Sequence, residues 1–126
     1  YISESQMTRV AGELSARKTI VDAAYFKGRV VVAGSTTADA DSDTLNLLDG
    51  AEDAGKPTSN IVSEIALTTP EGPAMTMTAT LGNGANSAIR NATVEFARTA
   101  EGNWTCTVDD NGAAGWKAKF VPAGCN

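Results

Sequence analysis

Apolar and polar residues alternate along four segments in the second half of the chain, 61–67, 75–81, 92–98 and 104–108. The second segment alternates three threonines with Met75, Met77, Ala79 and Leu81. A period of two places the apolar set on one face of a strand. The joints between segments are short and rich in Gly, Asn and Pro, which indicates hairpins. We therefore expect an antiparallel meander with one dry face and one wet, threonine-rich face.

The first 28 residues show a different period. Apolar residues recur at steps of three and four, at Met7, Val10, Leu14, Val21 and Ala24 or Tyr25. This spacing predicts an amphipathic helix, and Gly28 is a natural left-handed stop. Arg17 and Lys18 interrupt the stripe, where a basic side chain can lay its methylene groups along the core and keep its charge outside. The helix would cover the dry face, so the predicted fold class is α+β: a long N-terminal helix packed on a four-stranded antiparallel meander.

Residues 29–60 show no sustained period. Val30 to Val32 suggest a short strand, and the following Ser, Thr, Asp, Gly and Pro residues break any pattern. A connection of this length is usually functional or variable. The 126 residues fit a single domain, 1–126. We divide it into a helix (1–28), a connecting loop (29–60), the sheet (61–108) and a C-terminal loop (106–125).

The net charge of −5 comes from one segment. Six acidic residues and no basic one lie between positions 39 and 53, and removing this −6 leaves +1 for the rest of the chain. Nothing therefore indicates a broad basic groove for nucleic acid. Asp39, Asp41 and Asp43 are spaced as in the first half of an EF-hand loop. Thr44 replaces the turn glycine and Gly50 the bidentate Glu, so we expect a solvated loop and no metal site.

Cys106 and Cys125 are the chain's two cysteines, and it has no histidine. Two cysteines without another soft ligand cannot form a tetrahedral zinc site. Serine and threonine lack an activating imidazole or lysine, so we expect neither an enzyme nor a cofactor. The economical interpretation is one disulfide that ties the C-terminus to the domain and implies an oxidising compartment outside the cytosol. Two free thiols are the alternative.

Both ends of the chain resemble a known family. The opening 1–6, Tyr-Ile-Ser-Glu-Ser-Gln, is similar to the stretch that follows the membrane-inserted half of the helix in type IV pilins. Segment 102–106, Gly-Asn-Trp-Thr-Cys, resembles the last core strand of major pilins from Pseudomonas and related bacteria. Segment 120–125 resembles their closing Pro-x-x-Cys. The chain therefore resembles a major type IV pilin, and we expect an N-terminally truncated, soluble head domain.

The resemblance implies a structural subunit of a bacterial type IV pilus. Its partners would be other pilin subunits in a helical homopolymer, and the inner membrane before assembly through the missing N-terminal helix. The expected location is an extracellular, cell-surface filament with roles in adhesion, twitching motility, phage reception and DNA uptake. Two alternatives stay open: a secreted binding module that uses its disulfide loop, and a minor pilin or a pseudopilin of a secretion system.

The loop between the cysteines is the candidate recognition site. A tight turn is predicted by the composition of Asp109, Asp110, Asn111 and Gly112, and we expect it to expose backbone N–H and C=O groups. An aromatic side chain and two cations follow at Trp116, Lys117 and Lys119. If this stretch is extended, both lysines point to solvent. The family's disulfide loop is implicated in binding host-cell glycans; the alternative is a purely structural staple.

Overall fold

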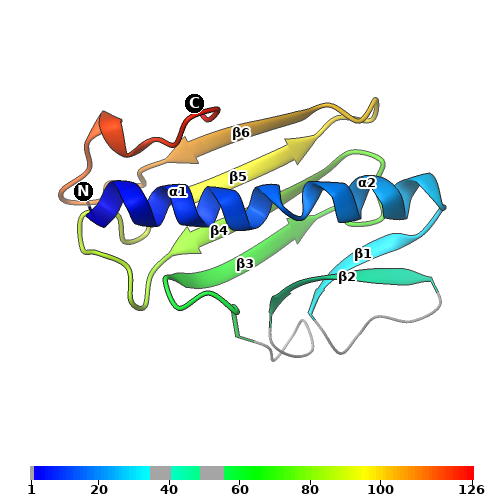
Figure 1. Ribbon diagram of the computed structural model, residues 1–126, viewed down its shortest axis with the longest axis horizontal. Coiled ribbons are helices and arrows are strands. Elements are labelled where there is room, and N and C mark those ends of the chain that lie inside the picture. The colour runs from blue at the N-terminus through cyan, green and yellow to red at the C-terminus, as the bar shows by residue number, and fades with distance from the viewer. Residues whose placement is uncertain (1, 35–40, 49–55) are drawn as a thin grey trace.

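The computed structural model describes residues 2–34, 41–48 and 56–126. Two helices come first, α1 (Ile2–Ser15) and α2 (Lys18–Phe26), followed by the strands β1 (Val30–Gly34) and β2 (Ser42–Leu48). The remaining elements are β3 (Val62–Thr68), β4 (Met75–Leu81), β5 (Thr93–Arg98), β6 (Trp104–Asp109) and the short 3₁₀ helix η1 (Ala118–Phe120). The two helices run along one face of the large sheet, and β1 and β2 lie beside its β3 edge (Figure 1).

The large sheet has the strand order β3-β4-β5-β6, and every pair is antiparallel. On β4 the four alternating apolar residues are buried, while the three threonines between them are partly exposed. Alternation of this kind follows from the pleat, which sends successive side chains to opposite faces. The predicted fold class, α+β with an N-terminal helix on a four-stranded antiparallel meander, is confirmed.

The core lies between the helices and the sheet. The fully buried helix residues are those of the predicted stripe, Met7, Val10, Leu14, Val21 and Ala24. They share one cluster with Met77, Leu81, Val94 and Phe96 from the sheet and with Ile89 from the β4–β5 connection. Burying one such large side chain contributes about 1.5–3 kcal/mol. This cluster therefore fixes the helices on the dry face.

The helical region contains a break that the sequence interpretation treated only as an interrupted stripe. α1 ends at Ser15 and α2 begins at Lys18. The Arg17 amide donates to Leu14 O at 3.0 Å, a bond one residue shorter than an α-helical bond. Its guanidinium is partly exposed and also bound to the protein, since Arg17 Nε donates to Leu45 O at 2.9 Å and Nη1 to Glu13 O at 3.0 Å. The charge is therefore held by backbone carbonyl groups of β2 and α1.

The connecting segment contains a second strand that the sequence did not indicate. β1 and β2 pair in parallel, with Val30 opposite Ser42 and Val32 opposite Thr44. The predicted short strand is part of β1, whereas β2 was taken as loop. Its alternation is broken because Asn46 adopts a left-handed φ of 54° and the next two residues, Leu47 and Leu48, are both buried.

Most of the acidic run lies outside the described residues. Asp41 and Asp43 are described, and Asp43 Oδ1 pairs with Arg29 Nη2 at 2.9 Å. In the described ranges no group of three or more His, Cys, Asp or Glu side chains is placed to hold a metal ion. None of the helices found there has the length and apolar character needed to cross a bilayer.

Candidate functional site

The C-terminal loop is closed by a disulfide between Cys106 and Cys125, with an S–S distance of 2.02 Å and 4.6 Å between the Cα atoms. The last residue, Asn126, pairs with the backbone of β6. Asn126 N donates to Cys106 O at 3.0 Å, and Val108 N donates to Asn126 O at 2.8 Å. The disulfide and these two hydrogen bonds cover one edge of the sheet, which would otherwise present unpaired backbone groups.

The predicted tight turn is present and is centred on Asn111 and Gly112. Their φ angles are 46° and 76°, both left-handed. Ala113 N donates to Asp110 O at 2.8 Å and closes the turn. Two successive positive φ angles are the pattern of a type I′ turn, which favours Asn followed by Gly.

The turn does not expose its backbone N–H groups as expected. Asn111 N donates to Asp109 Oδ1 at 2.8 Å, and Gly112 N donates to Asp110 Oδ1 at 3.0 Å. The two carboxylates thus act as acceptors inside the turn, as aspartates often do. Asn111 Nδ2 also donates to Asn91 O at 3.0 Å, which fixes the turn to the residues before β5. A ligand at this turn would therefore meet carboxylates and carbonyl groups rather than amide donors.

The stretch after the turn is extended at Lys117 but continues as the 3₁₀ helix η1, so the condition set in the sequence analysis is met only in part. Lys117 precedes η1, and the side chains of Lys117 and Lys119 are exposed. Trp116 is half-buried and meets the ring of Phe120 edge to face, with 5.5 Å between the centroids. Aromatic pairs favour this arrangement. Trp116 therefore anchors the loop on the buried Phe120, and the lysines are left on the surface.

Charges in the loop are not paired with one another. Within the ranges that the structure describes, the ion pairs are Arg29–Asp43 and Arg98–Asp22. Lys117 and Lys119 belong to neither. The loop therefore presents two ammonium groups to solvent, at positions 117 and 119, after a turn whose carboxylates accept hydrogen bonds from its own backbone. Such a surface can attract a polar or anionic ligand through charge.

A shallow groove of about 370 Å³ lies between α1 and the disulfide tail. Small side chains of α1, among them Ala11 and Gly12, form one wall, and residues 122–125 form the other. Phe96 and Lys18 complete it, with Lys18 Nζ 5.3 Å from the centroid of the Phe96 ring. The hydroxyl side chains of Thr8 and Ser15 also line the groove.

Three residues that hold the loop were not identified from the sequence. Asn91 accepts from the turn, and Asn126 pairs with β6. At Gly115 an added Cβ would lie 2.9 Å from Ala88 Cβ, so the loop backbone approaches the β4–β5 connection closely. Glycine beside a tight backbone approach is a recognisable signal. The other two contacts use backbone atoms and leave no signal in the sequence.

The sequence matches the pilin family, described as pilin (bacterial filament), over residues 3–126. The chain belongs to this family. It is 45% identical to fimbrial protein Q of Moraxella bovis over 130 residues, which cover 99% of the chain and 78% of the relative. Identity to the type IV major alpha-pilin of M. bovis is 44%, with the same coverage. A fimbrial protein of Pseudomonas aeruginosa is 33% identical, over 99% of the chain and 77% of the relative.

Membership of the pilin family agrees with the architecture. The protein is a structural pilin that assembles with other pilin subunits into a filament on the bacterial surface. The resemblance to type IV pilins, inferred from the two ends of the chain, is thereby confirmed along nearly its full length.

Proposed function

We propose that this pilin forms the body of a type IV pilus as its major subunit and has no enzymatic activity. The match to the pilin family over residues 3–126 supports this proposal most strongly. A repeated head-to-tail contact between identical subunits is heterologous and does not close, so it produces a fibre. Before assembly the subunit would be held in the inner membrane, through an apolar helical segment ahead of the head domain.

Deletion of the gene should remove the filaments from the cell surface, and complementation should restore them, as seen by electron microscopy of negatively stained cells. Twitching on agar and adhesion should be lost and regained together with the filaments. Filaments that persist in reduced number would identify a minor pilin. Unchanged filaments, motility and adhesion would contradict a role as a pilus subunit and favour a separate binding module.

The disulfide loop is our proposed receptor-binding surface, with host-cell glycans as the ligand class. Exposed Lys117 and Lys119 support this proposal, because no described acidic side chain pairs with them. The turn formed by Asp109, Asp110, Asn111 and Gly112 would supply acceptor oxygens, and Trp116 would hold the loop in shape. Neutralising both lysines should weaken binding, and the effect should shrink at high salt.

An oxidised peptide covering 106–125 should compete with whole pili for epithelial cells. The same peptide, reduced and alkylated, is the matched control, since it keeps the composition and loses the closed loop. A second peptide with Lys117→Ala and Lys119→Ala should compete less well. If the oxidised peptide has no effect while pili bind strongly, the loop is only structural and adhesion lies elsewhere on the fibre.

A further inference from the structure

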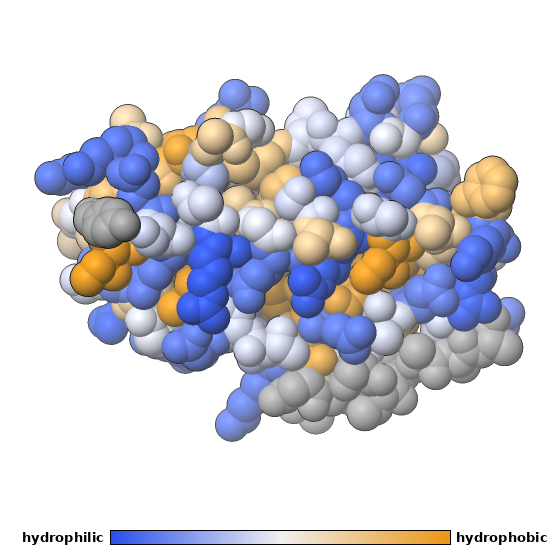
Figure 2. Space-filling model, in the orientation of Figure 1, coloured by the Kyte–Doolittle hydropathy of each residue, from blue (hydrophilic) through white to orange (hydrophobic). Residues whose placement is uncertain are grey.

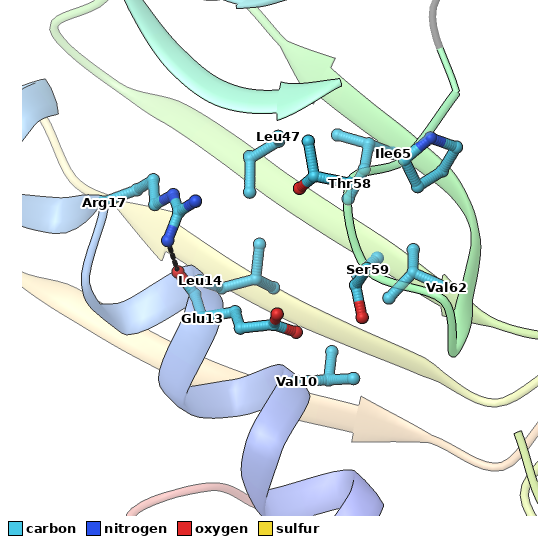
Figure 3. Close-up of a pocket in the computed structure, with 11 residues that line it drawn as sticks. Val10, Glu13, Leu14, Arg17, Leu47, Thr58, Ser59, Val62 and Ile65 are labelled. Atoms are coloured by element: carbon cyan, nitrogen blue, oxygen red, sulfur yellow. Dashed lines mark hydrogen bonds between the residues drawn. The ribbon is translucent and has the colours of Figure 1, made fainter. Parts of the chain in front are cut away.

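A small cavity lies between the middle of α1 and the residues that lead into β3 (Figure 3). Most of its lining is apolar, contributed by Val10, Leu14, Leu47, Val62, Ile65 and Ala79. Glu13 from α1 and Ser59 from the opposite wall also line it, and Figure 3 shows their carboxylate and hydroxyl groups directed into the space between the two walls. Two polar groups therefore share one largely apolar cavity.

Both polar groups are buried without a protein partner. Glu13 Oε1 and Ser59 Oγ are inaccessible to solvent and accept or donate no hydrogen bond to the described protein atoms. Ser59 is only 8% exposed. Nearly all buried polar atoms in folded proteins have a hydrogen-bond partner, either in the protein or in an ordered water. The pair therefore points to a bound group that satisfies both atoms.

The size and charge of the cavity restrict what this group can be. The free volume is about 10 Å³, which is close to the minimum that one water molecule needs. Arg17 also lines the cavity, and its guanidinium carries a positive charge. A cation there would be attracted by the Glu13 carboxylate but repelled by this guanidinium, and so small a volume leaves no room for a coordination shell. These conditions favour a small, neutral group that can both donate and accept.

We propose that one ordered water molecule binds between Glu13 and Ser59, donating to Glu13 Oε1 and exchanging a second hydrogen bond with Ser59 Oγ. It would complete a row of contacts along one side of α1. Arg9 Nη2 donates to Asn60 Oδ1 at 3.0 Å, and Arg17 donates to the backbone of β2. Arg9 and Glu13 are four residues apart on one face of α1, and Arg17 follows them in the break between the two helices. The water supplies the middle contact in this row.

The contacts of Arg9, Glu13 and Arg17 have a structural role in the head domain that is separate from assembly into the filament. Arg9, Glu13 and Arg17 face two parts of the connecting segment, Leu45 in β2 and Ser59 and Asn60 just before β3. The water-filled contact would fix the entry to β3 against the helix. The proposal concerns the folded head alone, so its failure would leave the filament function untouched.

Two measurements on the head domain test the proposal. In the wild type, water–protein NOE and ROE spectra should show a long-lived water next to the Ser59 amide. Oxygen-17 relaxation dispersion counts long-lived waters, and it should find one fewer in Glu13→Leu than in the wild type. The exposed residues Ser63 and Glu4 provide matched controls, since Ser63→Ala and Glu4→Gln should leave both signals unchanged.

A double-mutant cycle adds an energetic readout. Ser59→Ala and Glu13→Leu should each raise the unfolding equilibrium constant several-fold. In the double variant this constant should rise by less than the product of the two single fold-changes, because both partners bind the same water. The wild-type spectra decide the matter even if a variant fails to fold. Absence of a long-lived water, a direct hydrogen bond between Glu13 and Ser59 in a high-resolution crystal structure, or a signal that depends on sodium or ammonium would overturn the proposal.

Discussion

Asp22 connects helix α2 to the far strands of the sheet. Arg98 Nε donates to Asp22 Oδ1 at 2.8 Å, and Trp104 Nε1 donates to the same oxygen at 3.1 Å. The Arg98 guanidinium also lies 5.1 Å from the centroid of the Tyr25 ring. One carboxylate therefore satisfies two donors that are partly removed from water. The contacts fix the rotation of α2 on the sheet more specifically than apolar packing does.

Two glycines make a matched pair for substitution by alanine. At Gly72, φ is +64° and an added Cβ would lie 2.5 Å from Tyr25 Cζ, whereas a Cβ at Gly12 on α1 would meet nothing within 4 Å. Gly72→Ala should destabilise the protein by roughly 2–4 kcal/mol through ring overlap and backbone strain. Gly12→Ala should stabilise it by about 0.5–1 kcal/mol. Urea unfolding measures both, and equal effects would contradict this description.

Tyr25 should make stability depend on alkaline pH. Burial raises the pKa of its phenol from 10.0 to about 12, and Arg98 opposes the shift. Its hydroxyl donates to Pro70 O at 2.7 Å. The folded state keeps the proton to a higher pH than the unfolded state, so this contribution to stability is complete below pH 10.0 and is lost as the pH rises towards about 12.

Urea midpoints of the wild type and of Tyr25→Phe, measured from pH 7 to pH 12, test this expectation. The difference between the two proteins should stay constant up to about pH 10 and shrink above it. An ultraviolet titration should show one tyrosine ionising near pH 12 in the wild type. If the difference between the two proteins is the same throughout the range, Tyr25 does not carry the dependence.

Single-residue features of the loop differed in how well the sequence predicted them. The Asn111-Gly112 pair indicated a tight turn, because both residues tolerate left-handed φ angles. We did not deduce that Asp109 and Asp110 accept hydrogen bonds from the turn's own N–H groups, although such bonds are local and common. The contact from Asn111 to Asn91 spans 20 positions and depends on how β5 and β6 pair, which no local pattern contains.

At the scale of elements, the four antiparallel strands were the easiest to predict. Their side chains largely alternate between a buried and a wet face, without a break on β4 and with one register shift on β3 between Val62 and Glu64. β2 was missed, since it pairs in parallel with β1 and has no regular alternation. Arg17 and Lys18 interrupted the predicted stripe where the helix breaks, but the break itself was not predicted, and the Arg17 contact with Leu45 O involves a strand that had not been predicted either.

The disulfide should stabilise the tail more than the sheet. Its cysteines are separated by 19 positions, and closing a loop of this size is worth about 3 kcal/mol in the chain-entropy model. In the Cys106→Ser, Cys125→Ser double variant we expect lower protection from hydrogen exchange at Val108 N and Asn126 N. Amides at the β4–β5 pairing should stay protected.

Global loss of protection across the sheet would show that the tail is required for the fold as a whole. Non-reducing mass spectrometry of secreted material checks the bond itself, because two free thiols there would contradict it. The Cys125→Ser single variant is less suitable, since it leaves Cys106 able to form intermolecular disulfides.

At the scale of the whole molecule, the outer face of the helices is mainly hydrophilic, with hydrophobic side chains visible only in small patches (Figure 2). The apolar stripe from Met7 to Ala24 is already buried against the sheet. Among the described residues, the large hydrophobic side chains that remain exposed are Ile2, at 62%, and Phe26, at 93%. Single exposed apolar residues of this kind are common and do not by themselves hold subunits together.

The head domain alone should therefore be a monomer or at most a weak oligomer. Sedimentation velocity at tens of micromolar should give one species near the mass of 13.0 kDa. A tight, large oligomer would mean that the head surfaces supply more of the filament's association energy than this face suggests. Phe26→Ser is the natural companion variant, because it removes the most exposed large side chain in the described part of the chain without touching the core.

The consecutive strand order β3-β4-β5-β6 also bears on how quickly the chain folds. Each strand pairs with its neighbour in the sequence, so little loop-closure entropy is lost at each step. Docking α1 is different, since its hydrogen bond from Ser3 to Asn86 joins residues 83 positions apart and therefore closes a much longer loop. We expect the β4–β5 hairpin to form before α1 docks. Substitutions in the hairpin should then slow refolding, and substitutions in α1 should mainly speed unfolding, as the two arms of a chevron plot would report.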